Sequence, residues 1–309
     1  MSSMPTVSVV MSVYNGAETL GASVQSLLSQ EGVDFELIVV DDGSTDASAA
    51  MLKELAAADR RIRVIHQEKN RGLTHALIRG CASARGEFIA RQDCDDLSLP
   101  GKLSRELHAI RSRQNVALVS CGTRFVGPRG EVLYEVVGTA GDATDDLLTL
   151  DLARLRGPAG HGSTLFRRDL YERVGGYREQ FYFAQDMDLW TRLVEHGRHV
   201  VLPEVLYQVS VALGSISSLR RSHQVACTKI ILECARLRRS GKAEAEALAR
   251  ASAIRPDARE PGASDLAAEL YFVGACLRQR SDPRARQYFI DALRAYPLHF
   301  KAAMRLLMN

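Results

Sequence analysis

Apolar positions in the first hundred residues alternate between short continuous runs and segments with helical spacing. The continuous runs are rich in β-branched residues, as in strands buried on both faces, and cover residues 7–13, 36–40, 62–65 and 87–90. Apolar residues at three- and four-residue intervals fill the gaps, over residues 18–30, in a segment capped by Asp46, and over residues 73–84. This alternation predicts βαβ units and a parallel sheet.

The pattern changes after residue 100. Helical spacing covers residues 102–112, 142–150 and 186–196, and strand-like runs cover residues 116–120, 123–126, 132–137, 163–166, 199–202 and 205–209. A Gly-Pro-Arg-Gly turn at residues 127–130 predicts a hairpin. The prediction is an α/β fold with a mixed, mainly parallel sheet flanked by helices.

Beyond residue 215 only helical patterns occur, at residues 224–239, 243–253, 264–278 and 283–296. We therefore expect a catalytic domain at residues 1–217 and an α-helical C-terminal region at residues 218–309. The stretch near residues 264–297 resembles one helical hairpin of the tetratricopeptide kind, although a single copy has no neighbouring repeat on which to pack.

Charge divides the chain in the same way. Hydrophobic residues make up 46% of the 309 residues and charged residues 25%, which is ordinary for a globular protein. Residues 216–309 carry 17 Lys and Arg but only 9 Asp and Glu, a net charge of +8, whereas residues 1–215 have a net charge of −5. The basic tail predicts peripheral contact with an anionic membrane. An Arg-rich solvated helical surface explains the same pattern, and no nucleic-acid partner is predicted.

The six cysteines form no CxxC pair and have no histidine partners at zinc spacing, which favours free thiols in a reducing compartment. The N-terminal apolar run is only strand-length and lacks a preceding basic segment, so no signal peptide is expected. No run reaches the roughly 18 apolar residues of a membrane span. The predicted location is the cytoplasm, with peripheral attachment at the inner face of the cell membrane.

Two predicted strands end in clusters of carboxylates. FELIVVDDGSTD ends its apolar run at Asp41 and Asp42, and GEFIARQDCDDLSLP at Asp93, Asp95 and Asp96. Ligands bind at the carboxyl ends of strands in open α/β sheets, and crowded carboxylates repel unless a cation or hydrogen-bond donors are shared. Oxygen ligands of this kind suit Mg²⁺ or Mn²⁺ together with phosphate oxygens. Aspartates that cap helices or form turns are the alternative for each cluster taken alone.

Several motifs in a fixed order resemble glycosyltransferase family 2, which has the GT-A fold. They are VSVVMSVYNGAETLGASVQSLLSQ, FELIVVDDGSTD, NRGLTHALIRGCASARGEFIARQDCDDLSLPGKL, HGSTLFRRDLYERVGGY and AQDMDLWTRL. The resemblance spans about residues 7–217. It implies an inverting enzyme that uses a nucleotide-diphosphate sugar and a divalent cation, Mn²⁺ or Mg²⁺.

The resemblance also assigns roles to positions of this chain. It implies that the nucleoside pocket is lined by Ser12, Tyr14 and Asp42, with Asp41 in support. It implies that Asp93 contacts ribose or the sugar and contributes to the metal site. Asp95 is implied as the ligand of the cation that bridges the diphosphate, with Asp96 supporting it.

Asp186 matches the position of the family's general base. Gln185 stands where many members have Glu, so this assignment depends on Asp186 alone, and Cys94 replaces a common Ala. A carboxylate in the first turn of a helix is the structural alternative for Asp186. His161 lies where related chains often have a histidine, and an imidazole near the diphosphate is expected to bind the donor, its metal or the leaving group. A lone histidine is more often a structural hydrogen-bonding group. Residues 214–217 are expected to be a loop that closes over the diphosphate, with a plain turn before the C-terminal helices as the alternative.

The predicted function is transfer of a sugar from a nucleotide donor, with UDP favoured, to a glycan or lipid-linked acceptor in cell-surface polysaccharide synthesis. A nucleotidyltransferase is the first alternative, although residues 14–20 lack the Lys or Arg of a basic phosphate loop. A dehydrogenase is disfavoured because that turn has no GxGxxG. A catalytically weak scaffold that binds sugar nucleotides is the alternative from another class. The intact Asp93, Asp95 and Asp186 argue against it.

Overall fold

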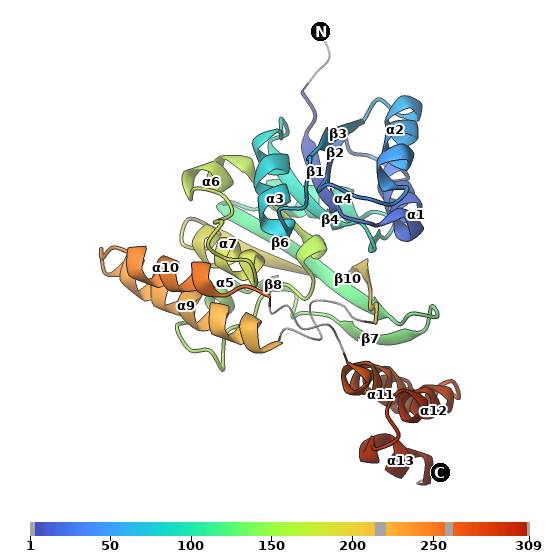
Figure 1. Ribbon diagram of the computed structural model, residues 1–309. Coiled ribbons are helices and arrows are strands. Elements are labelled where there is room, and N and C mark those ends of the chain that lie inside the picture. Colours follow the sequence, from blue (N-terminus) through green and yellow to red (C-terminus); the bar gives the residue numbers. More distant parts are fainter. Residues whose placement is uncertain (1–3, 214–220, 257–261, 308–309) are drawn as a thin grey trace.

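The computed structural model describes residues 4–213, 221–256 and 262–307. Its strands are β1 (Val7–Val13), β2 (Phe35–Asp41), β3 (Ile62–His66), β4 (Phe88–Asp93), β5 (Leu97–Ser98), β6 (Val116–Val126), β7 (Val132–Val136), β8 (Gly141–Asp142), β9 (Thr164–Arg167) and β10 (Arg198–Ser210). Within the described residues they form one ten-stranded sheet of order β3-β2-β1-β4-β9-β6-β10-β5, with β7 beside β6 and β8 beside β10 (Figure 1).

The first half of the sheet is parallel, as the alternating pattern predicted. β1 pairs in parallel with both β2 and β4, and β2 pairs in parallel with β3. β2 is buried along its whole length, and Ser12 is the only position of β1 that is not fully buried. Continuous apolar runs with branched side chains form these strands because helices cover both of their faces.

The second half is mixed, because β9 runs antiparallel to its neighbours β4 and β6 whereas β10 is parallel to β6. Two predicted strand pairs are single long strands in the structure, so those boundaries were wrong. Residues 116–120 and 123–126 both belong to β6, and residues 199–202 and 205–209 both belong to β10. The break at Pro203 is instead an irregularity within β10, where the register shifts between Leu202 and Val205. Proline cannot donate a ladder hydrogen bond, so a bulge tolerates it.

Helices form a layer on each face of the sheet. One face is covered by α1 (Ala17–Leu28), α2 (Ser48–Ala58) and α4 (Lys102–Ser112), and the other by α3 (Leu73–Ala82), α5 (Thr144–Leu148), α6 (Arg168–Arg173) and α7 (Gln185–Leu193). Figure 1 shows these two groups on opposite sides of the central strands. The predicted mixed sheet between helical layers is confirmed.

The rest of the described chain is helical, as predicted. It comprises α9 (Arg221–Arg239), α10 (Ala245–Ala253), α11 (Ala263–Gln279), α12 (Ala285–Ala295) and α13 (Phe300–Leu307). Helices α9 and α10 pack beside α7 through Phe181, Cys227 and Ile231, whereas α11 to α13 share a core with Leu133 of β7. No helix among residues 4–213, 221–256 and 262–307 is both long and apolar enough to cross a bilayer. The proposed division at residue 217 falls outside the described residues and stays a prediction.

Candidate active site

The carboxyl ends of three parallel strands meet at one edge of the sheet. In the register of β1, Ser12 lies beside Asp93 of β4, and Val13 lies beside Asp41 of β2. The side chain of Asp93 is 33% exposed, whereas Asp41 is almost fully buried. Parallel pairing therefore brings Ser12, Asp41 and Asp93 together at the edge where α/β sheets bind ligands.

Asp41 and Asp42 hold the two loops that follow β2 and β3. Asp42 accepts hydrogen bonds from Gln67 Nε2 (2.7 Å), Arg71 N (2.9 Å) and Gly72 N (2.8 Å). Asp41 accepts one from Ser44 N (3.0 Å), and its other oxygen lies 3.1 Å from His66 Nδ1. Burial raises the pKa of Asp42, although the backbone bonds from Arg71 and Gly72 oppose the rise. Each carboxylate has about four lone-pair sites, so Asp41 and Asp42 can still accept a hydrogen bond from a nucleoside in addition to these bonds.

The loop after β1 is fastened to the loop after β2. Asn15, which adopts a left-handed conformation (φ 51), accepts a hydrogen bond from Thr45 N (2.8 Å) and donates its own N–H to Ser44 Oγ (3.0 Å). Tyr14 precedes it and is 47% exposed, unusually open for so large a ring. The exposed ring is available to a planar ligand.

Asp93, Asp95 and Asp96 have three different environments. Asp96 is buried and accepts hydrogen bonds from Tyr207 Oη (2.8 Å) and Ser210 N (2.9 Å), so it ties β10 to this turn. Asp95 is half-buried and has no protein cation of its own among the described ion pairs. Burial, followed by repulsion from Asp93, raises the pKa of Asp95. A shared cation would relieve both effects.

Arg91 lies beneath this cluster as a fully buried cation that the sequence analysis missed. Its side chain is 1% exposed, and its Nη1 forms an ion pair with Asp93 Oδ2. Within the described part of the chain, Nε and Nη2 have no hydrogen-bond acceptor. The ion pair holds Oδ2 of Asp93, and the partly exposed side chain leaves the second oxygen, Oδ1, available to a ligand as its outer oxygen.

The carboxylates fit a cation that is only partly coordinated by protein. No group of three or more His, Cys, Asp or Glu side chains in residues 4–213, 221–256 and 262–307 could hold a metal ion by itself. Asp95 and the outer oxygen of Asp93 offer two oxygen donors. Asp93 already pairs with Arg91, whereas Asp95 has no cationic partner among the described ion pairs. Mg²⁺ is usually bound in this way, by one or two carboxylates, while phosphate oxygens and water complete its shell.

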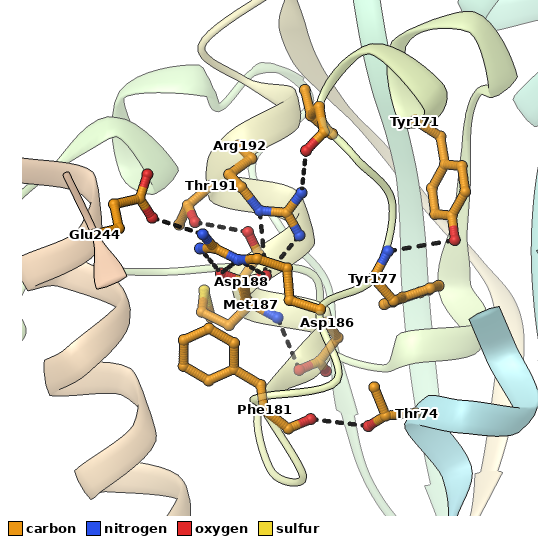
Figure 2. A network of polar contacts seen from close by, with 12 residues as sticks. Thr74, Tyr171, Tyr177, Phe181, Asp186, Met187, Asp188, Thr191, Arg192 and Glu244 are labelled. Atoms are coloured by element: carbon orange, nitrogen blue, oxygen red, sulfur yellow. Dashed lines mark hydrogen bonds and ion pairs between the residues drawn. The ribbon is translucent and has the colours of Figure 1, made fainter. Parts of the chain in front are cut away.

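Asp186 lies in the first turn of α7, at the end of a restrained loop. Thr74 of α3 donates a hydrogen bond to the carbonyl of Phe181 (2.9 Å), and Ala184, directly before the helix, has a left-handed backbone (φ 55). Asp186 Oδ1 accepts the N–H of Met187 (2.8 Å), as Figure 2 shows.

The charge environment of Asp186 joins it to the strand edge. Burial raises its pKa, and repulsion from Asp93 adds to the rise, whereas the Met187 N–H and the charge of Arg91 oppose it. Asp186 is therefore close enough to both Arg91 and Asp93 to feel their charges. A half-buried carboxylate with a raised pKa at a ligand edge has the properties of a general base.

Asp188, two residues later, has a structural environment instead. It is completely buried and forms ion pairs with Arg178 and with Arg192 Nη2 (2.5 Å), while Arg178 Nη1 also pairs with Glu244 Oε2 (2.6 Å) before α10 (Figure 2). Burial acts to raise the pKa of Asp188, but Arg192 and Arg178 outweigh it and the pKa is lowered. This network fastens the helix that carries Asp186 to α9 and α10.

Replacing Asp188 by asparagine is expected to lower the free energy of unfolding by about 3–5 kcal/mol, because the buried Arg192 loses its counter-charge and Arg178 keeps only Glu244. Urea denaturation at neutral pH measures this. Asp142→Asn, which breaks an exposed pair with Arg198, should cost less than about 1 kcal/mol. Since the folded-state pKa is lowered, the contribution of Asp188 is present at neutral pH and disappears as the pH falls through that pKa. Equal losses for both variants would show that the buried network does not support α7.

His161 lies in the 3₁₀ turn His161–Ser163. Its Nε2 is 2.7 Å from Tyr177 Oη, and its ring meets the edges of Tyr177 and Trp190. Burial, with the charge of Arg91 adding to it, lowers the pKa of His161, so the imidazole is neutral at pH 7. Trp190 is 2% exposed and packs in the core, as the sequence analysis favoured.

Gly162 is required by close packing. A Cβ atom at this position would lie 1.9 Å from Tyr207 Oη, the hydroxyl that donates to Asp96. The Gly-His-Gly-Ser turn therefore packs directly against the residue that positions the aspartate motif. The predicted diphosphate loop at residues 214–217 lies outside the described residues.

The part of the chain that forms the parallel strands and carries the clustered aspartates has a match among known families. The family model of glycosyl transferase family 2 matches residues 8–175, more than half of the chain. The chain belongs to this family. It is a glycosyltransferase, as the motifs indicated.

Two curated relatives illustrate the match for this family 2 glycosyltransferase. The EpsE protein of Bacillus subtilis (strain 168), named a glycosyltransferase, is 34% identical over 216 residues, which cover 68% of this chain and 74% of EpsE. The succinoglycan biosynthesis protein ExoO of Rhizobium meliloti (strain 1021) is 42% identical over 102 residues, which cover 33% of this chain and 29% of ExoO.

Solved structures show the same fold at low sequence identity. S. aureus TarS 1–349 in complex with UDP-GlcNAc matches with a TM-score of 0.60 and 17% identity, covering 94% of this chain and 81% of that chain. The mannosyltransferase PcManGT from Pyrobaculum calidifontis, in complex with GDP-Man and Mn²⁺, matches with a TM-score of 0.55 and 19% identity, covering 99% and 84%. The family 2 glycosyltransferase described here therefore has the predicted GT-A fold.

Proposed function

We propose that this glycosyltransferase moves a sugar, with inversion at the anomeric carbon, from a nucleoside-diphosphate donor to a hydroxyl group of a growing surface glycan. One observation carries the proposal. Packing links Asp93 at the end of β4 to α7, the helix that carries Asp186. Tyr207 Oη accepts the Asp93 N–H (3.2 Å) and packs against Gly162, and the ring of the adjacent His161 lies 5.9 Å from that of Trp190 in α7. A donor held at Asp93 would thus lie near the start of α7, with Asp186 available to its acceptor.

The donor end of the site is proposed to follow the sheet edge. Ser12, Tyr14 and Asp42 would line the nucleoside pocket, with Asp41 holding the loop beneath it, and Asp93 would bind ribose or sugar hydroxyls through its outer oxygen. Supporting this assignment, Tyr14 is exposed, and Asp93 keeps one oxygen clear of its ion pair with Arg91. UDP is the favoured nucleoside diphosphate, because the TarS neighbour is titled as a UDP-GlcNAc complex.

Asp95, with Asp93, is proposed to hold a divalent cation, Mn²⁺ or Mg²⁺. Such a cation, when bound, neutralises charge on the diphosphate leaving group. The PcManGT neighbour, titled as a complex with Mn²⁺, supports this choice. His161 is half-buried and its pKa is lowered, so we propose that it contributes a hydrogen bond on the donor side rather than a charge.

Asp186 is proposed to take the proton of the acceptor hydroxyl while the new glycosidic bond forms. An alcohol is far too weak an acid to ionise at neutral pH, so a positioned carboxylate must accept its proton during the reaction. A raised pKa makes the carboxylate of Asp186 a stronger base than that of an ordinary aspartate. Attack on the face opposite the leaving diphosphate inverts the anomeric centre.

The acceptor is proposed to be a glycan or lipid-linked glycan at the inner face of the cell membrane. The name of ExoO, a succinoglycan biosynthesis protein, supports a role in polysaccharide synthesis. The +8 charge of residues 216–309 supports peripheral contact with an anionic membrane.

Release of nucleoside diphosphate from a panel of UDP-, GDP- and dTDP-sugars, each with Mn²⁺, tests the proposal. We expect at least one donor to raise the melting temperature by mass action and to be hydrolysed slowly when no acceptor is present. A donor that binds but is never hydrolysed, whatever the cation, would favour the scaffold. No binding of any sugar nucleotide would refute both functions.

A further inference from the structure

The last described helix, α13, has two apolar stripes, and only one of them is covered. Ala302 and Leu306, four residues apart, pack into the core formed with α11 and α12. Phe300, Met304 and Leu307 lie at i, i+4 and i+7 and form a second stripe, in which the three residues are 77%, 55% and 81% exposed. The second apolar stripe of α13 is therefore not used in packing against the rest of the described chain.

We define the α13 face as Leu298, Phe300, Met304 and Leu307. Leu298, which precedes the helix, is 64% exposed. Four large apolar side chains so close in sequence, three of them on one stripe, form an uncovered apolar surface of the kind that marks a binding site.

Positive charge lies next to the α13 face. Lys301 and Arg305, again four residues apart, form a stripe beside it, and neither side chain has an ion-pair partner among the ion pairs of the described residues. Large apolar residues flanked by free basic residues are typical of helices that lie in the interface of an anionic bilayer. This border complements the phosphates of an anionic bilayer, whereas a second copy of the basic tail would be repelled by it.

The α11–α13 unit is fixed close to the proposed donor site. Tyr288 of α12 donates a buried hydrogen bond to Glu131 (2.6 Å) in the β6–β7 turn, and Val211 packs into the core of the unit. Val211 directly follows Ser210, whose N–H bonds Asp96 of the aspartate motif (2.9 Å). The end of β10, at Ser210 and Val211, therefore joins the α11–α13 unit to the sheet edge that would hold the donor.

We propose that the α13 face inserts into the surface of an anionic lipid bilayer, with Lys301 and Arg305 among the phosphate headgroups. Figure 1 shows α13 at the end of the helical unit, away from the central sheet. The partner is a bilayer rich in acidic phospholipid, which would present a lipid-linked acceptor to the site. That last step rests on the proposed function, whereas binding to the bilayer does not.

Sedimentation of the full chain with vesicles at low salt tests the inference. The chain should bind vesicles of phosphatidylcholine with phosphatidylglycerol and bind phosphatidylcholine alone much more weakly. The variant Phe300→Ser/Met304→Ser/Leu307→Ser should bind the anionic vesicles about tenfold less, since the buried apolar area is lost. Lys301→Glu/Arg305→Glu should lose the preference for anionic lipid.

Matched controls distinguish binding through the α13 face from non-specific adsorption of exposed apolar side chains and from misfolding. Leu152→Ser and Val225→Ser remove exposed apolar side chains elsewhere and should bind vesicles like the unaltered chain. Each variant should retain the melting temperature of the unaltered chain and its rate of donor hydrolysis measured without vesicles.

Equal binding to neutral and anionic vesicles, or unchanged binding by the triple variant, would overturn the inference. A dimer in light scattering that the triple variant dissociates would also overturn it, because the occupant would then be a second copy. If the unaltered chain bound anionic vesicles but hydrolysed no donor, only the proposed function would be refuted.

Discussion

Replacing Asp186 by asparagine is expected to lower kcat for sugar transfer by about 10²- to 10⁴-fold, the usual contribution of a positioned general base. Asparagine keeps the shape and the hydrogen bond from Met187 N (2.8 Å) but cannot accept a proton. The donor KM should change little, because Asp186 acts on the acceptor hydroxyl. Steady-state kinetics with saturating donor measures both constants.

The matched control for this variant is Asp145→Asn. Asp145 is also an aspartate in the first turn of a helix, α5, but it is exposed and lies outside the site. It should leave kcat within about twofold of the unaltered enzyme. If the Asp186 variant behaved like this control, Asp186 would be a helix-terminal carboxylate and not the base.

The dependence of kcat on pH gives the same test without a substitution. The base must be ionised, and the pKa of Asp186 is raised by burial and by Asp93. Activity should therefore fall, as the pH decreases, at a higher pH than an ordinary aspartate would allow.

Replacing Asp95 by asparagine is expected to reduce turnover at low Mn²⁺ by about 10³-fold, since Lewis-acid stabilisation of the leaving group is worth several kcal/mol. Asparagine keeps the size of the Asp95 side chain but removes the negative charge that would bind the cation. Excess EDTA should abolish turnover of the unaltered enzyme, and added Mn²⁺ should restore it.

Raising the Mn²⁺ concentration should partly rescue Asp95→Asn, because the defect is one of metal affinity. Titration of Mn²⁺ in the presence of UDP measures that affinity independently of turnover. Full activity in excess EDTA, or the same Mn²⁺ affinity in both proteins, would reject the role of Asp95.

The parts of the site that the sequence predicted are local to strand ends. Continuous apolar runs identify β1, β2 and β4, and parallel pairing then fixes where Asp41 and Asp93 lie. The family resemblance added Asp186, whose position no periodicity could have given. Strand boundaries near Pro203 were wrong because a long strand absorbs a bulge that looks like a break in sequence.

The parts that the sequence did not predict depend on contacts between distant segments. Tyr207 follows Asp93 by 114 residues, yet its hydroxyl accepts the Asp93 N–H (3.2 Å) and supports Asp96. Arg91 is the clearest missed residue. A charged residue two places before Asp93, in an otherwise apolar strand, was the available signal, because a buried arginine needs an anionic partner.

The most direct measurement of the central claim is a crystal structure with an intact sugar nucleotide and Mn²⁺. The account predicts that Asp95 would be among the ligands of the metal, together with oxygens of the diphosphate, and that the sugar would face Asp186. A nucleotide bound elsewhere, with Asp93 and Asp95 turned toward solvent and no metal between them, would contradict it.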